Sequence, residues 1–265
     1  MIMHVLPLLV FTTFSGMAAG AYVIDALYGL GRTSGNRVLS DSKSTHAWLF
    51  PFVCLVLLGI GLCGTLAHLG QPLRFVNGLS NPVSMISQEA YWSIAFGIVI
   101  VIDLFLAKVR GRVPRPVRWV GAVVAVGLMF VTGLAYYQSL GVPAWSGAAT
   151  LSLFVIGDLV LGASLCVLLE RKGLTDRRLV CMNVAADIAF AVVLVSYGLY
   201  LTRIGTDMTA LLIVAGLIGP MMSSAIAIAT HSGKISTQVG GVAMFVFAAV
   251  GVVLARSVFF AAGML

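Results

Sequence analysis

Apolar residues run in long blocks along this chain, and polar residues are confined to the short stretches between the blocks. A block of about 20 apolar residues is long enough to cross roughly 30 Å of membrane hydrocarbon as an α-helix. The pattern predicts eight such helices, at residues 3–30, 47–67, 88–108, 117–140, 148–170, 179–202, 209–230 and 238–261. Because the connections are short, we expect an all-α, polytopic membrane helix bundle that forms a single integral-membrane domain over residues 1–265.

The composition agrees with a membrane protein. Hydrophobic residues make up 60% of the chain and charged residues only 9%, which lies outside the range of soluble globular domains. No Lys or Arg precedes the first apolar block, and this argues against a cleaved signal peptide. We therefore expect the first block to be retained as a transmembrane helix.

The basic residues predict the orientation of the bundle. Of the 16 Lys and Arg residues, 13 lie in or beside the first, third, fifth and seventh connections, and only Arg74, Arg203 and Arg256 belong to the other side. The positive-inside rule places those four connections in the cytoplasm, so both termini are expected on the outer, periplasmic side. Basic residues facing anionic lipid headgroups account for the net charge of +7 without a nucleic-acid partner.

One outer connection is unusually polar. The stretch AHLGQPLRFVNGLSNPVSMISQEAYW, from Ala67 to Trp92, carries His68, Arg74 and Glu89. Its Gly and Pro residues predict an irregular backbone, which is tolerated near lipid only when protein covers it. His68 ends one predicted helix and Glu89 opens the next, so we expect both side chains to face one pocket. Two structural roles stay open, namely a His bonded to a backbone carbonyl and a Glu stabilised by the helix dipole.

This stretch resembles the loop after the second helix of the DmsC family, the membrane-anchor subunits of dimethyl sulfoxide reductase-type molybdoenzymes. The residues that match the family pattern, in order, are His68, Leu69, Gly70, Pro72, Arg74, Asn77, Leu79, Ser87 and Glu89. The resemblance extends over the whole chain, including the ARSVFF segment around Arg256. The chain departs from the family at Val252, where members often carry an acidic residue about one turn before that arginine.

The resemblance implies an enzyme subunit that oxidises membrane quinol, typically menaquinol, near the outer surface. It also implies two partners, a ferredoxin-type iron–sulfur subunit with four clusters and a molybdopterin catalytic subunit, held at a bacterial or archaeal cytoplasmic membrane. The terminal substrate would be reduced in a different polypeptide. The implied catalytic residues are His68, Glu89 and Arg74, and the implied quinol-binding residues are these three with Asn77 and Arg256.

The chemistry of quinol oxidation suits these residue types. The reaction releases two protons and two electrons, and imidazole and carboxylate groups are natural proton acceptors. Arg74 has two open roles, because it can stabilise developing negative charge or pair with a lipid phosphate or a docked subunit.

The sequence predicts neither haem nor an iron–sulfur cluster nor a metal site in this chain. The histidines lie near predicted helix ends, and none is placed at mid-span on facing helices, where two haem ligands would be needed; they are His4, His46, His68 and His231. The four cysteines fall inside predicted helices without a CxxC pair, and we expect them to be small buried core residues; they are Cys54, Cys63, Cys166 and Cys181.

Four aspartates fall inside predicted helices, where an unpaired ionisable group costs several kcal/mol. They are Asp25, Asp103, Asp158 and Asp187. One interpretation is a proton path across the bundle. The other is that each aspartate bonds to a neighbouring helix and fixes the packing, with Asp25 paired to Arg32 and Asp103 to nearby basic residues.

These aspartates also support an alternative function, a proton-conducting or transporter-like protein related to NrfD and polysulfide reductase subunits. Such a protein is expected to have a midplane site at a broken helix, for which Gly219 and Pro220 are the candidates. A purely structural anchor is the third function that the sequence leaves open.

Overall fold

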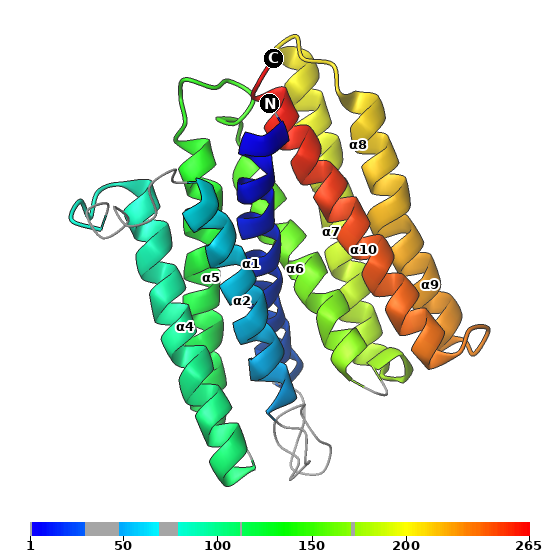
Figure 1. Ribbon diagram of the computed structural model, residues 1–265. Helices are drawn as coiled ribbons and strands as arrows, with labels where there is room; N and C mark the ends of the chain where they lie inside the picture. Colours follow the sequence, from blue (N-terminus) through cyan, green and yellow to red (C-terminus); the bar gives the residue numbers. More distant parts are fainter. Residues whose placement is uncertain (1, 30–47, 69–78, 112, 171–172) are drawn as a thin grey trace. The chain divides into compact units, whose positions relative to one another are not determined.

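The computed structural model describes residues 2–29, 48–68, 79–111, 113–170 and 173–265, while the side chains of residues 2–4, 68 and 173 lie outside that description (Figure 1). The described residues form helices and connections and contain no strand. The helices are α1 (Ile2–Gly29), α2 (Leu49–His68), α4 (Met85–Arg110), α5 (Arg115–Tyr137), α6 (Ala149–Leu169), α7 (Arg177–Arg203), α8 (Thr209–Gly216), α9 (Met222–His231) and α10 (Thr237–Ala262). A short 3₁₀ turn, η2, covers Gly173–Thr175, and a π-helical segment, η3, covers Leu217–Met221.

The eight membrane helices predicted from the apolar blocks are confirmed. Within the described residues, eight helices are long and apolar enough to cross a membrane, the seventh being the continuous rod of α8, η3 and α9. Predicted and observed ends agree because the length of an apolar block fixes the length of a membrane helix. The side of the membrane on which the termini lie stays a prediction.

The chain divides into two compact units, Met1–Val131 (unit 1) and Thr132–Leu265 (unit 2). Unit 1 holds α1, α2, α4 and most of α5, and unit 2 holds the end of α5 with α6 to α10. Nothing in this division tests the prediction of a single integral-membrane domain.

Small residues bring α1 and α2 together in unit 1, where the two helices lie side by side (Figure 1). A Cβ atom at Gly64 would lie only 2.8 Å from the Pro7 carbonyl oxygen, so the two backbones touch at this point. Further along the pair, the ring of Tyr22 lies 5.2 Å from the rings of both Phe50 and Phe96. Close helix approach through glycine is typical of membrane proteins, where packing replaces the hydrophobic effect between helices.

Aromatic side chains close one end of unit 2. The Phe259 ring packs against Tyr136, Trp145 and Phe154 with centroid distances of 5.1–5.8 Å. The Trp145 indole N–H donates to the Phe259 carbonyl at 3.0 Å, and the Tyr197 hydroxyl donates to the Ala144 carbonyl at 3.0 Å. These bonds fix the connection between α5 and α6 to the helices below it.

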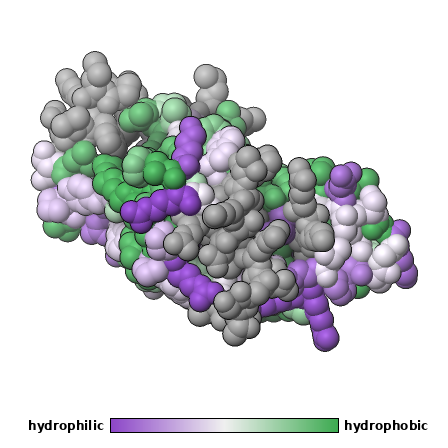
Figure 2. Space-filling model, turned by 90° about the horizontal axis from the view of Figure 1, so that it is seen from below, coloured by the Kyte–Doolittle hydropathy of each residue, from purple (hydrophilic) through white to green (hydrophobic). Residues whose placement is uncertain are grey.

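Each unit has exposed basic residues in or beside its connections. Lys108, Arg110, Arg115, Arg177 and Lys234 all have exposed side chains at helix ends or in turns. Figure 2 shows hydrophilic residues in purple beside hydrophobic ones in green on the face seen from below. This pattern is the one that the positive-inside rule uses.

The segment Leu217–Met221 is wound as a π-helix around Pro220. Proline has no N–H, and one wider turn lets the rod continue into α9 without a break. The broken helix expected of a transporter at Gly219 and Pro220 is therefore not observed in this described segment. Gly219 lies against α10, and a Cβ atom there would be 2.7 Å from the Cα atom of Gly251.

Replacing Gly219 by Ala should destabilise unit 2, because the added methyl group meets backbone that cannot move aside. Overpacking of this kind costs about 1–3 kcal/mol. The free energy of unfolding in detergent micelles measures the effect. The matched control is Gly59→Ala on α2, where a Cβ atom meets nothing within 4 Å, and equal stability of the two variants would contradict the close backbone contact.

Candidate functional site

The predicted quinol site falls only partly within the described residues. Arg74 and Asn77 lie outside them, and for His68 only the backbone, as the last residue of α2, is described. Glu89 is described in full, on the second turn of α4. Contact between the His68 imidazole and the Glu89 carboxylate therefore stays a prediction. The helices show only whether the two residue positions are compatible with such a contact.

The helices place His68 and Glu89 at the same end of unit 1. α2 and α4 pack against each other, and a Cβ atom at Gly97 would lie 3.5 Å from a methyl group of Leu58. Measured along the axes from that contact, His68 lies about 15 Å away on α2 and Glu89 about 12 Å away on α4, at 1.5 Å per residue. Figure 1 shows the end of α2 and the start of α4 at the same end. The two positions thus differ in depth by less than one helical turn.

Glu89 is half-buried. No described residue donates a hydrogen bond to its carboxyl group or forms an ion pair with it. Ser93 follows one turn further into the unit, where its hydroxyl is buried and has no described partner. Trp92 packs beside them against Gly127 of α5. Buried polar groups normally have a partner, so unpartnered ones point to water or a ligand.

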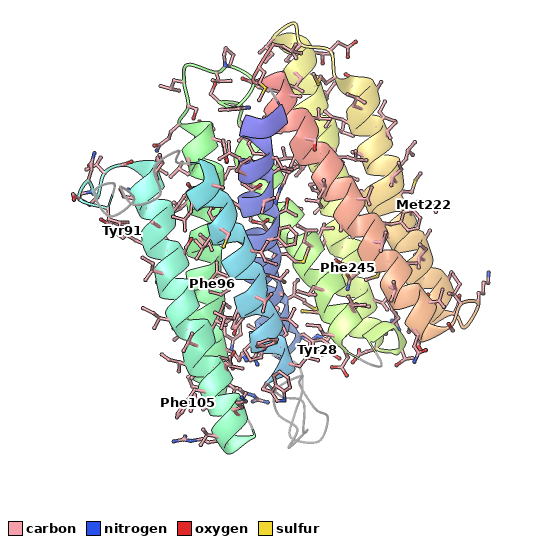
Figure 3. All side chains as sticks on the ribbon, in the orientation of Figure 1. Tyr28, Tyr91, Phe96, Phe105, Met222 and Phe245 are labelled. Carbon is pink, nitrogen blue, oxygen red and sulfur yellow. The ribbon has the colours of Figure 1, made fainter. Side chains whose placement is uncertain are left out.

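The described part of the outer connection, residues 79–84, folds back on the start of α4. The Tyr91 hydroxyl donates to the Leu79 carbonyl, and the Gln88 amide donates to the Pro82 carbonyl at 3.4 Å. Figure 3 shows Tyr91 at this end of α4. Val83 remains 80% exposed, so this part of the connection offers an apolar side chain to whatever covers it.

Two of the intramembrane aspartates meet one arginine inside unit 1. The Arg118 Nη1 atom donates to Asp25 at 3.0 Å, and its Nε atom lies 3.0 Å from the carboxylate of Asp103. The Tyr22 hydroxyl donates to Asp103 at 2.8 Å, and the guanidinium lies over the Phe50 ring at 4.5 Å. Two carboxyl groups thus share one cation, and one oxygen of each is buried without a described hydrogen-bond partner.

This arrangement corrects two expectations. Asp25 was expected to pair with Arg32, which lies outside the described residues, and the structure gives it Arg118 instead. Arg118 was expected among the basic residues facing the cytoplasm, yet it is only 4% exposed. The sequence did indicate that Arg118 is buried, because Arg118, Ala122 and Ala125 are spaced so that they lie on one face of a helix. The expectation that Asp103 pairs with a nearby basic residue is confirmed.

In unit 2, Arg256 pairs with Asp158. The guanidinium is fully buried, bonds the carboxylate of Asp158, and lies 5.2 Å from the Phe154 ring centroid. This pair explains why an arginine lies inside the helix, and a quinol-binding role for Arg256 stays a prediction.

Asp187 differs from the other three aspartates. Its carboxylate accepts a hydrogen bond from Ser224 of α9 at 2.8 Å, and no described Lys or Arg pairs with it. Within unit 2, no described hydrogen bond or ion pair joins it to the pair of Asp158 and Arg256. The proton path through these aspartates stays a prediction, while the alternative, bonds that fix the packing, fits the contacts observed.

Other candidate ligands show no cluster. Among the described residues, no group of three or more His, Cys, Asp or Glu side chains could hold a metal ion. Cys54 and Cys166 are buried as expected, but the expectation of burial is wrong for Cys63 and Cys181, which are exposed. Both exposed thiols lie on helix faces that would meet lipid, where a small apolar side chain needs no protein cover.

The comparison with protein families finds a match over most of the sequence. Residues 1–232 match the family described as DMSO reductase anchor subunit (DmsC). Three curated relatives are similar to this protein. The C subunit of the anaerobic dimethyl sulfoxide reductase of Haemophilus influenzae is 27% identical over 177 residues, which are 62% of the present sequence and 60% of that relative.

Two Escherichia coli K12 proteins are also similar. The C subunit of its anaerobic dimethyl sulfoxide reductase is 29% identical over 229 residues, covering 83% of the present sequence and 78% of the relative. The anaerobic dimethyl sulfoxide reductase subunit YnfH is 28% identical over 209 residues, covering 76% and 71%.

Replacing Arg118 by Ala should strongly destabilise unit 1, because it leaves two buried carboxylates without their cation. Breaking a buried ion pair in this way costs about 3–5 kcal/mol. The matched control is Lys108→Ala, at the exposed end of α4. Unfolding in detergent micelles measures both, and an Arg118→Ala protein as stable as the control would show that the cluster does not hold the helices together.

Proposed function

The chain belongs to the DMSO reductase anchor subunit family, DmsC, and we propose that it oxidises a membrane quinol at the outer end of unit 1. We infer that this quinol is menaquinol. As a member of this family it is a membrane-anchor subunit of an oxidoreductase complex. The observation that carries the proposal is the half-buried, unpartnered carboxyl group of Glu89 at the level where α2 ends in His68.

Physical chemistry supports Glu89 as a proton acceptor. A carboxyl group that no described residue neutralises, next to the buried hydroxyl of Ser93, is free to bond a substrate hydroxyl. The other carboxyl groups inside the helices are less available. Asp25, Asp103 and Asp158 each have an arginine, and that cation already takes up their charge.

In the proposed reaction, a quinol loses its two hydroxyl protons and two electrons and leaves as the quinone. His68 and Glu89 accept one proton each and release them to the outer compartment. Arg74 and Asn77 bind the oxygens as negative charge develops on them. The electrons pass to a metal cluster of a partner subunit, because the sequence predicts no redox centre in this chain.

The proposed partners are a ferredoxin-type iron–sulfur subunit with four clusters and a molybdopterin catalytic subunit, which reduces the terminal acceptor. The complex would sit at a bacterial or archaeal cytoplasmic membrane. The connection around Val83, exposed in the isolated protein, supports docking of the iron–sulfur subunit above Glu89. Docking there would also bring a cluster near the quinol and cover the irregular backbone.

The alternative of a proton channel or transporter has less support. Its expected broken helix is a continuous rod through the π-helical segment, and three of its four candidate aspartates are held by arginines within the described residues. A purely structural anchor differs from the proposed function in one measurable way, which is whether changes at Glu89 affect electron transfer.

Glu89→Gln should lower quinol-driven reductase activity by about 10²–10⁴-fold, the usual worth of a positioned general base. The measurement is turnover with a reduced quinol analogue in membranes that contain the whole complex. Turnover with a reduced viologen dye, which gives electrons directly to the partner subunits, should stay unchanged.

The matched control for this experiment is Asp207→Asn, the same chemical change at an exposed carboxylate in another connection. Full quinol-driven activity in Glu89→Gln, with the complex still on the membrane, would refute the proposed role of Glu89 and is the result that a purely structural anchor predicts.

In membranes that contain this protein without its partner subunits, a Val83→Cys variant should react with a membrane-impermeant maleimide added from the periplasmic side. Lys234→Cys should react only after the membrane is permeabilised, because the positive-inside rule puts that connection in the cytoplasm. Both variants need Cys63 and Cys181 replaced by Ala to remove their exposed thiols. The reverse labelling pattern would overturn the orientation and place the proposed site on the cytoplasmic side.

A further inference from the structure

Unit 2 contains an apolar groove of about 670 Å³ between α7 and the rod of α8, η3 and α9. One face of α7, from Asp187 to Thr202, forms one wall, and one face of the rod, from Thr209 to Ser224, forms the other. The walls are almost wholly aliphatic between these ends. Ile188, Val195 and Leu199 are each about 60% exposed along α7, so the groove opens to the side of the unit.

Small residues keep this groove open. A Cβ atom at Gly198 would lie 3.4 Å from Leu212, and one at Gly216 would lie 3.6 Å from Leu194, which are ordinary contact distances. A methyl group would therefore fit at either glycine, whereas a longer side chain would project across the groove. From Asp187 to Thr202 the groove extends about 22 Å, at 1.5 Å per residue, which is room for several isoprene units of an extended chain.

A polar pair closes the inner end of the groove. Asp187 is the eleventh of the 27 residues of α7, near the middle of its span, and Ser224 donates to it from α9 at 2.8 Å. Asp25, Asp103 and Asp158 each have an arginine, but no described cation pairs with Asp187. Of these four aspartates, the one without a described cation is thus the one that lines the groove.

The backbone of the rod is irregular at the same place. The π-helical segment around Pro220 borders the groove, and proline supplies no N–H to the carbonyls of the preceding turn. Segments of this kind are frequent at functional sites. A carboxyl group and a serine hydroxyl therefore meet beside the π-helical segment, at one end of an otherwise apolar groove.

We propose that this groove binds a molecule of prenylated quinone or quinol, with its ring at Asp187 and Ser224 and its isoprenoid chain between α7 and α8. This proposal rests on the proposed function for the identity of the ligand, and it adds a site distinct from the one at Glu89. A quinone or quinol is neutral, carries carbonyl or hydroxyl groups on a compact ring, and bears a long apolar chain. The polar groups of the ring match Asp187 and Ser224, and the chain matches the aliphatic walls of the groove.

The other occupant available in a membrane is a phospholipid, and it fits less well. Its charged headgroup cannot reach the middle of a span without a large cost, and its acyl chain has no polar atom for Asp187. A phospholipid would fill the apolar length of the groove and leave the polar end unmatched.

Photolabelling in membranes containing the whole complex tests the proposal. The probe is an azido-naphthoquinone with an isoprenoid chain, and cross-linked peptides are identified by mass spectrometry. We expect labels within residues 187–202 and 209–224. Asp187→Leu and Gly216→Leu should each lower that labelling at least five-fold, whereas Gly59→Leu, a leucine added to an exposed face of α2, should not change it.

Three outcomes would overturn the proposal. They are the absence of quinone labels on these peptides, labels that Asp187→Leu does not reduce, and stronger labelling by a phosphatidylcholine with a diazirine in its acyl chain. Wild-type labelling decides the question even where a variant does not fold.

The Glu89→Gln variant separates this result from the proposed function. Lost quinol-driven turnover with retained groove labelling supports both sites. Retained turnover refutes the role of Glu89 and leaves the groove to be judged by its own labels.

Discussion

A carboxylate inside a bilayer has to find its counter-charge within the protein, because lipid offers none. In each unit of this protein that counter-charge is one arginine on the last helix, Arg118 for Asp25 and Asp103 and Arg256 for Asp158. Arg118 joins α5 to α1 and α4, and Arg256 joins α10 to α6. These ion pairs are specific, directional contacts between helices, which apolar contacts between similar surfaces are not.

The same constraint separates structural from functional candidates. Three acidic side chains inside the helices are held by an arginine, while Glu89 and Asp187 have no described cation. Glu89 lies near the level at which α2 ends, and Asp187 lines the groove of unit 2. A polar group without a charged protein partner, next to unfilled space, is the most direct indication of a ligand.

The sequence predicted the helices well because the thickness of the bilayer sets the length of a membrane helix, and each apolar block shows that length directly. It predicted the partners of the aspartates less well. Asp25 bonds Arg118, which is 93 residues away, and nearness in sequence pointed to Arg32 instead. The π-helical turn at Leu217–Met221 was also beyond prediction, since Pro220 is compatible with a break, a kink or a wider turn. The site at His68 came from the resemblance, and composition alone left it open.

The order of charges along the sequence has a consequence for membrane insertion. Asp25 and Asp103 precede Arg118, and Asp158 precedes Arg256, so in both units the acids are synthesised before the base. A lone arginine within a membrane helix opposes insertion, by about 2.5–3.5 kcal/mol where it lies at the centre of the span. When the arginine helix leaves the ribosome, its carboxylates are already in the membrane and can receive it. Each unit can thus form its ion pairs as soon as its last helix enters the membrane.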